Sequence, residues 1–346
     1  MKLRSLISSL VLCILTTFFV VSCTNPATNS GDNAQTTTPS TPTVRVSLGY
    51  SAWPGYFPWQ IAQDENIFKE NNVSVDLKWF DGYLESITTL TSEKIDANNQ
   101  TLVDTVSSAA GGADQVIVLT NDISTGNDKI IAREGINSIA DLKGKKVAAE
   151  EGTVDHFLLL LGMEKAGLSP KDIQFVPLET GKAATAFVGG QVDAVAVFAP
   201  FTTQALKLKG SKELFSSKEF PGAASDHLVL TRKFVDANPT QVQAMVDSWF
   251  DALEFIKTNP DRANEIMAKR AGVTVEEYKG YAEGTKILSI EENLKSFEEG
   301  KDWASMKYAS REFSKFLINF GMTKTAPNIE KLFDDRFIKA YAAKKS

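Results

Sequence analysis

The chain has 346 residues, 43% of them apolar, and a formal net charge of −6. Because it is acidic and carries no basic block inside its globular part, it is a poor partner for nucleic acid or for an anionic membrane surface. The globular composition from Val44 onward covers about 300 residues, enough for two ordinary domains or one large one.

Residues 1–22 have the layout of a secretory signal peptide. Lys2 and Arg4 precede a short apolar run, and small residues lead to Cys23. This segment resembles a bacterial lipobox, which implies that Cys23 becomes the N-terminus and carries a lipid anchor of acyl chains such as palmitate. An uncleaved membrane anchor is the alternative. Since Cys13 is the only other cysteine, the mature chain would have no internal disulfide, thiolate metal site or cysteine nucleophile.

Residues 23–43 are predicted to be the lipidated N-terminus and a flexible linker. The segment consists almost entirely of Thr, Ser, Asn, Pro, Ala and Gly, and it has no aromatic residue. Such a composition buries too little apolar surface to offset the entropy lost on ordering. We therefore expect a tether that lets the folded part stand off a membrane.

Strands and helices alternate from Val44 to about Phe198. The predicted strands are 44–50, 73–80, 95–97, 116–120, 145–150, 173–177 and 194–198. The predicted helices between them are 59–69, 86–92, 101–111, 154–166 and 182–189. Beyond Phe234 the pattern is helical, most clearly over 239–258. This order indicates α/β lobes with parallel sheets, and late helices that pack back on the first lobe.

Five short motifs in this order resemble nitrate/sulfonate/taurine-type (NitT/TauT, NMT1/THI5-like) solute-binding proteins. They are Ser-Ala-Trp-Pro-Gly-Tyr at 51–56, Lys-Ile-Asp-Ala at 94–97, the segment 138–147, Gly-Gly-Gln-Val-Asp-Ala at 189–194, and Asn-Pro at 259–260. The resemblance implies a type II periplasmic-binding-protein-like fold, with two lobes joined by two crossovers and the ligand in the interlobe cleft. It also implies a monomer without a cofactor that delivers its ligand to an ABC permease and ATPase.

This family pattern sets the expected boundaries of the lobes. Lobe I is predicted to comprise 44–140 and 228–346, and lobe II to comprise 141–227. The two crossovers, near 136–143 and 223–229, would contain the hinges. Closure of the lobes around the ligand would then shift an open–closed equilibrium by the extra affinity of the closed form.

Ligands of open α/β sheets bind beyond the carboxyl ends of the strands, so the loops there supply the candidate site residues. We expect the ligand to be contacted by Trp53, Tyr56, Asp81, Asp104, Asp128, Glu151, Thr153 and Phe198. Each has a structural alternative. Asp81 could start a turn with Gly82, an acid early in a helix suits the helix dipole, and the aromatic rings could belong to the core.

The same loops are rich in carboxylates, among them Asp122 and Asp226, and Lys129, Arg133 and Lys182 are the nearby cations. This balance favours a small nitrogenous ligand, either a guanidinium-like cation or a urea- or amide-like molecule, held by carboxylates and covered by aromatic faces. Such a ligand would make nitrogen uptake the purpose of transport. The alternative is a sulfonate, taurine or nitrate anion, as the family resemblance implies.

An enzyme is the competing class of function. Pyrimidine-precursor synthases of thiamine biosynthesis are similar in fold, but they depend on histidine and a cysteine-rich motif. Here His156 and His227 are isolated, no cysteine follows Cys23, and no metal-ligand spacing is visible. We therefore expect a binding protein without metal, and keep a thiamine-pyrimidine-precursor binder or synthase as a remote alternative. A sensor that passes its ligand to a membrane receptor is a third interpretation.

Overall fold

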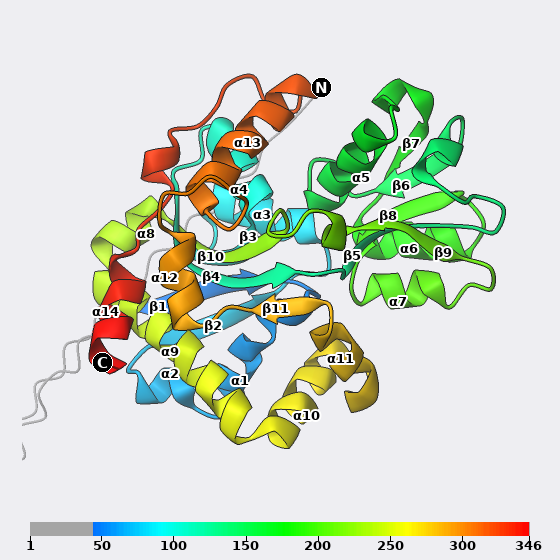
Figure 1. The fold of residues 1–346 in the computed structure, drawn as a ribbon. Helices are drawn as coiled ribbons and strands as arrows, with labels where there is room; N and C mark the ends of the chain where they lie inside the picture. Colours follow the sequence, from blue (N-terminus) through cyan, green and yellow to red (C-terminus); the bar gives the residue numbers. More distant parts are fainter. Residues whose placement is uncertain (1–43, 346) are drawn as a thin grey trace, which may run out of the picture. The chain divides into compact units, whose positions relative to one another are not determined.

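The computed structural model describes residues 44–345 (Figure 1). The predicted signal peptide, the lipid on Cys23 and the linker 23–43 lie outside the described residues. Everything described belongs to one unit, Pro42–Ser346. Over this part of the chain, no helix combines the length and apolar character needed to cross a membrane.

Lobe I contains a six-stranded sheet in the order β11-β4-β10-β3-β1-β2. Its strands are β1 Arg45–Tyr50, β2 Ser74–Trp79, β3 Ala97–Thr101, β4 Gln115–Ser124, β10 Ser225–Thr231 and β11 Thr285–Ile287. β1 pairs in parallel with β2 and β3, whereas β10 runs antiparallel to both β3 and β4. The sheet is therefore mixed.

Lobe II contains a five-stranded sheet in the order β7-β6-β8-β5-β9. Its strands are β5 Asp128–Ala132, β6 Lys146–Ala149, β7 Gln174–Pro177, β8 Ala194–Phe198 and β9 Lys212–Ser216. β6 pairs in parallel with β7 and β8, and β5 runs antiparallel to β8 and β9. Both lobes thus join a parallel part to an antiparallel one.

Helices cover both sheets. They are α1 Pro58–Asp64, α2 Ile67–Glu70, α3 Tyr83–Thr91, α4 Leu102–Ala110, α5 Val154–Lys165, α6 Thr180–Val188, α7 Phe201–Leu206, α8 Arg232–Ala237, α9 Pro239–Thr258, α10 Pro260–Ala271, α11 Val275–Ala282, α12 Ile290–Ser296, α13 Met306–Asn319 and α14 Arg336–Lys345. In lobe II, α5 lies on one face of the sheet, and α6 and α7 lie on the other (Figure 1). The late helices, from α8 onward, pack with lobe I.

β8 and the last three residues of β5 are apolar at consecutive positions because both faces of the lobe II sheet are buried there. Ile130 packs with Leu158 and Leu159 of α5, whereas its neighbour Ile131 packs on the other face with Phe187 of α6. Successive side chains of a strand point to opposite faces, so a buried two-sided sheet needs apolar residues at consecutive positions. This explains the runs at 130–132 and 194–198.

The predicted boundaries between the lobes need correction. β5 pairs in the second sheet, so the chain first passes between sheets at residues 125–127, before the predicted boundary at 140. The return crossover covers 217–224, and the predicted boundary at 227 falls inside β10, a strand of the first sheet. Segment 128–132 is a strand that was not predicted because its first two residues are charged. Its other three residues are all buried.

Two other predictions about elements were wrong. The helix expected over 59–69 is broken into α1 and α2 by Asn66, whose φ of 62° is left-handed. Segment 116–120 belongs to β4, and the two strands that pair with β4, β10 and β11, are antiparallel to it rather than parallel. A strand buried on both faces carries the same apolar pattern in either orientation, so the sequence does not distinguish them.

Candidate functional site

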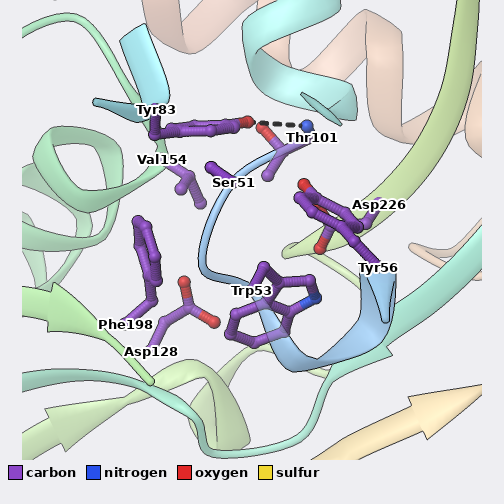
Figure 2. Close-up of a pocket in the computed structure, with 9 residues that line it drawn as sticks. All are labelled: Ser51, Trp53, Tyr56, Tyr83, Thr101, Asp128, Val154, Phe198 and Asp226. Carbon is purple, nitrogen blue, oxygen red and sulfur yellow. Dashed lines mark hydrogen bonds between the residues drawn. The ribbon is translucent and has the colours of Figure 1, made fainter. Parts of the chain in front are cut away.

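A small cavity lies between the two lobes (Figure 2). It is lined by Ser51, Trp53, Tyr56, Tyr83, Thr101, Asp128, Val154, Phe198 and Asp226. Its free volume is about 10 Å³, close to that of one water molecule. Ser51 and Thr101 stand at the carboxyl ends of β1 and β3, which is where an open α/β sheet places its ligands.

The turn after β1 supplies two of the aromatic walls. Residues 54–56 form a short 3-10 helix that begins at Pro54, with Trp53 before it and Tyr56 as its last residue. The indole Nε1 of Trp53 donates a 2.9 Å hydrogen bond to Asp122, and the Tyr56 hydroxyl donates to Asp226. At Gly55, an added Cβ would come within 2.0 Å of the Asp122 carboxylate. Glycine therefore allows the turn to lie directly on this acid.

Lobe II contributes the opposite wall. Asp128 begins β5 and is paired in register with Phe198, the last residue of β8. Val154 is the first residue of α5. The Phe198 ring meets Trp53 and Tyr83 of lobe I edge-on, at centroid distances of 6.0 and 5.9 Å. Figure 2 shows these rings and Tyr56 on different sides of the same space.

Asp122 and Asp226 form a buried carboxyl pair beside the cavity. They are direct cross-strand neighbours in the β4–β10 ladder, and both are shielded from solvent. Burial raises the pKa of Asp122 to about 8, and burial together with the charge of Asp122 raises the pKa of Asp226 well above its usual range. Like charges placed opposite each other repel, so a proton on the pair relieves this cost.

Asp128 is a carboxylate that both lines the cavity and has an oxygen without a hydrogen-bond partner. The side chain is buried, and the oxygen without a partner is Oδ2. Burial raises its pKa to about 6, and the Ser124 hydrogen bond and the charge of Lys129 oppose that rise. A buried acceptor without a donor is costly, and a cationic donor in the cavity would remove this cost.

Asp104 lies behind the cavity wall rather than in it. Its Oδ2 accepts hydrogen bonds from the Tyr83 hydroxyl at 2.8 Å, the Thr101 hydroxyl at 2.7 Å and the Val154 amide of lobe II at 3.3 Å. Burial raises its pKa to about 7 despite these donors. It thus holds three lining residues in place and, through Val154, connects the lobes.

A second acidic cluster lies in lobe II. The Thr180 hydroxyl is 2.8 Å from Glu150 Oε2 and 2.7 Å from Asp155 Oδ2. Since a hydroxyl has one hydrogen, one of these carboxyls must itself donate. Burial and the charge of Asp128 raise the pKa of Asp155 well above its usual range, which favours Asp155 as the donor. Glu150 also reaches lobe I, where it accepts from the Leu84 amide at 3.0 Å.

The cations predicted to be near the site point elsewhere. Lys129 forms an ion pair with Glu213, and Lys182 with Glu179 at 2.7 Å. Arg133 donates to the Val192 carbonyl and lies over the Phe187 ring. None of the residues that line the cavity carries a basic side chain. The electrostatic character of this site is therefore set by acids.

The eight predicted ligand residues fall into three groups. Trp53, Tyr56, Asp128 and Phe198 line the cavity. Asp104 and Thr153 are buried beside it, and the Thr153 hydroxyl donates to the Glu150 carbonyl. The structure places Asp81 and Glu151 away from the cavity, exposed at the surface. Asp81 accepts from Trp79 Nε1, and the acid turned inward is Glu150, not Glu151.

Five residues that line the cavity were not among the predicted ligand contacts: Ser51, Tyr83, Thr101, Val154 and Asp226. Ser51 and Thr101 end strands, and Asp226 is one of the acids already noted near strand ends, so position alone pointed to these three. Tyr83 and Val154 are the first residues of helices, and the sequence at such a position does not indicate which way the side chain points. Both reach the cavity only because the lobes face each other here.

Neither histidine is a candidate for metal binding. His227 is fully buried, with its pKa lowered by burial to about 3, and its Nε2 is bonded to Ser225. His156 accepts from the Gly152 amide and stacks on Phe175. Within residues 44–345, no group of three His, Cys, Asp or Glu side chains is arranged to hold a metal ion.

Two mixed α/β sheets, two crossovers and a polar cavity between the lobes define a type II periplasmic-binding-protein fold. The sequence matches the NMT1/THI5-like family model over residues 53–263, and the chain belongs to that family. In structure it is similar to the alkanesulfonate-binding protein SsuA of Xanthomonas axonopodis pv. citri. The TM-score is 0.70 at 19% identity, over 84% of this chain and 98% of the other.

Two relatives are similar in sequence. A protein of Brucella abortus (strain 2308), named as a binding protein, is 31% identical over 191 residues, which cover 53% of this chain and 58% of that protein. The taurine-binding periplasmic protein of Escherichia coli (strain K12) is 25% identical over 256 residues, or 71% of this chain and 79% of that protein. The chain thus spans somewhat more than half the length of the Brucella relative.

Proposed function

We propose that this protein is an extracytoplasmic solute-binding protein that captures a small molecule and delivers it to an ABC permease and ATPase. Family membership, the two-lobed fold and the names of its relatives support this role. Those relatives are named as binding proteins, which supports a function without catalysis. The lipobox-like segment ending at Cys23 supports attachment to a membrane through a lipid. We also propose that the protein acts as a monomer.

The ligand proposed from the geometry is a small nitrogenous cation of the guanidinium type. The observation that carries this proposal is the buried, partnerless Oδ2 of Asp128 in a cavity that Asp226 also lines and no base lines. A guanidinium offers planar paired donors to carboxylates, and its faces suit aromatic walls. A neutral urea- or amide-like ligand uses the same acceptors without the charge.

Such a ligand would bridge the lobes. Asp128 and Phe198 belong to lobe II, whereas Asp226, Tyr56 and Trp53 belong to lobe I. A cation held between Asp128 and Asp226 gains contacts in the closed form that neither lobe offers alone. It therefore shifts the equilibrium toward closure by this difference in affinity.

A sulfonate, taurine or nitrate ligand is the second candidate, and the comparisons favour it over the cation. One relative is named for taurine, and the structural neighbour is an alkanesulfonate-binding protein. An anion in this cavity would rely on the hydroxyl of Ser51, which has no hydrogen-bond partner, because the Thr101 hydroxyl already donates to Asp104. It would also lie beside Asp128 and Asp226. It would need those acids to hold protons. Taurine is an intermediate case because its ammonium group suits the carboxylates.

Isothermal titration of the purified full chain decides between these ligands. We expect guanidinium chloride to bind, and nitrate, taurine and an alkanesulfonate to bind more weakly or not at all. Tight binding of an anion without binding of guanidinium would overturn the cation. Binding of a pyrimidine precursor of thiamine alone would favour the remote alternative. For the anchor, Cys23→Ala should move the protein from the membrane fraction to the soluble one.

A further inference from the structure

A second, apolar cavity adjoins the polar one. It is lined by Asp128, Val154, Phe157, Leu158, Leu161, Ser217, Phe220, Ala223 and Ala224. Asp128 and Val154 line both cavities, so the two share a wall. The second cavity also has a free volume of about 10 Å³, the size of a methyl group or one water molecule. Apart from Asp128 and Ser217, all of its lining side chains are apolar.

The walls of the polar cavity favour an organic cation, which is a ligand that also carries apolar groups. Four of its nine lining residues are aromatic, and the Phe198 ring is nearly perpendicular to Trp53 and Tyr83, at 84° and 80°. Rings set around a space in this way attract organic cations, whose carbon-bound hydrogens carry part of the positive charge. A strongly hydrated ion gains less there, because the cavity offers few polar partners to replace the water that it loses.

From these two observations we propose that the preferred ligand is an N-alkylguanidinium with a substituent of one carbon. This proposal rests on the proposed cation-binding function and adds a subsite to it. The guanidinium lies between Asp128 and Asp226 within the aromatic walls. It is larger than the cavity of about 10 Å³, so the lobes must part to admit it. The alkyl group passes Val154 into the apolar cavity, against Phe157, Leu161 and Ala223. Asp128 stands at the junction, where the charged end of such a molecule meets its apolar end.

A titration series on the full chain measures this preference. Guanidinium, methylguanidinium, ethylguanidinium and butylguanidinium differ only in apolar length. A buried methylene contributes about 0.8 kcal/mol, or about fourfold in affinity. We expect methylguanidinium to bind about fourfold more tightly than guanidinium, and the ethyl and butyl compounds to bind progressively more weakly because a cavity of this size holds one methyl group. Guanidinium binding as tightly as methylguanidinium, or more tightly, would overturn the subsite.

Three variants locate the effect. Ala223→Leu fills the apolar cavity and should abolish the gain from the methyl group. Leu161→Ala enlarges the cavity and should remove the penalty of the butyl group. Leu160→Ala is the matched control, since Leu160 is buried on the same helix but does not line the cavity. It should leave the affinity ratios unchanged. Equal ratios in Leu161→Ala and Leu160→Ala would contradict the placement.

The outcomes also separate this inference from the function on which it rests. If no guanidinium compound binds, the cation-binding function fails and the alkyl subsite fails with it. If guanidinium binds through Asp128 but added carbons bring no gain, the function stands and only the subsite is wrong. A ratio of affinities within one variant is independent of the fraction of protein that is folded, so loss of stability cannot imitate either result.

Discussion

Asp128 is the residue on which the proposed ligand charge depends most directly. Its carboxyl is buried, its Oδ2 lacks a partner and it lines both cavities. Asp128→Asn keeps the size of the side chain and removes the charge. Because hydrogen bonds to charged groups contribute about 1.5–3 kcal/mol, we expect guanidinium affinity to fall by more than about tenfold in a calorimetric titration.

Asp81 provides the control for this measurement. It was predicted to bind ligand, but it is exposed and bonded to Trp79, outside the cavity. Asp81→Asn should therefore leave the affinity within about twofold of the wild type. Equal losses of affinity in the two variants would mean that binding depends on the overall negative charge around the cleft rather than on a direct contact with Asp128.

Gly55 controls the geometry of the turn that carries Trp53 and Tyr56. In Gly55→Ala, the new methyl would meet Asp122 at 2.0 Å, so the turn or the acid must move. We expect a loss of about 1–3 kcal/mol in the free energy of unfolding, together with weaker ligand binding. Gly280→Ala is the control, because no atom lies within 4 Å of its added Cβ and alanine favours the helix. It should retain stability and affinity in denaturant titration and calorimetry.

At the scale of elements, the N-terminus of α5 links the lobes. Thr153 precedes this helix, but its hydroxyl donates to the Glu150 carbonyl and does not cap α5. Asp104 of lobe I accepts the Val154 amide instead. The first amides of a helix lack partners within it, so this carboxylate satisfies in the closed form a donor that water would satisfy in the open one.

Asp104→Ala should therefore favour the open form. Leaving a buried amide without a partner costs about 1–3 kcal/mol. We expect a larger radius of gyration by small-angle X-ray scattering and about tenfold weaker ligand binding. Asp96→Ala removes a carboxylate that bonds to Ser47 within lobe I, so it should change neither quantity. A radius of gyration that stays at the wild-type value in Asp104→Ala would contradict the interlobe role.

The elements that sequence predicted well are those whose pattern is local. Runs such as 194–198 and 154–166 carry their own period and closely match β8 and α5. Pairing is not local. The crossover at 125–127 and the antiparallel course of β10 depend on which strands meet, and β5 was missed because Asp128 and Lys129 open it.

The candidate site shows the same division. Trp53 and Tyr56 were identified because a Pro-Gly turn after a strand fixes two rings together. Tyr83 was missed because it contacts Phe198, a residue of the other lobe that is far from it in the sequence. The sequence indicated that carboxylates as a class surround the site, but the fold determines which of them come together in space. Asp226 entered the cavity wall and Asp81 did not.

For the molecule as a whole, folding brings several acidic side chains close together at the cleft and buries them away from water. Asp122, Asp226, Asp128, Asp104 and Asp155 are all buried, and burial raises the pKa of each. In the unfolded chain the same groups return to ordinary values near 4. The folded protein therefore binds more protons than the unfolded chain between about pH 4 and pH 8. The stability that these protons supply is fully present below pH 4 and is lost as pH rises through the folded pKa values.

Stability without ligand should consequently fall as pH rises from 5 to 8, the interval that contains the pKa values of about 6, 7 and 8 for Asp128, Asp104 and Asp122. Thermal unfolding should show a decrease in Tm on the order of 5 °C, and Asp122→Asn should reduce it. A bound guanidinium favours the ionised acids, so the increase in Tm that it causes should grow over the same interval as protons are released. A Tm that rises with pH would contradict this linkage, and an increase caused by ligand that shrinks with pH would favour an anion in the cavity.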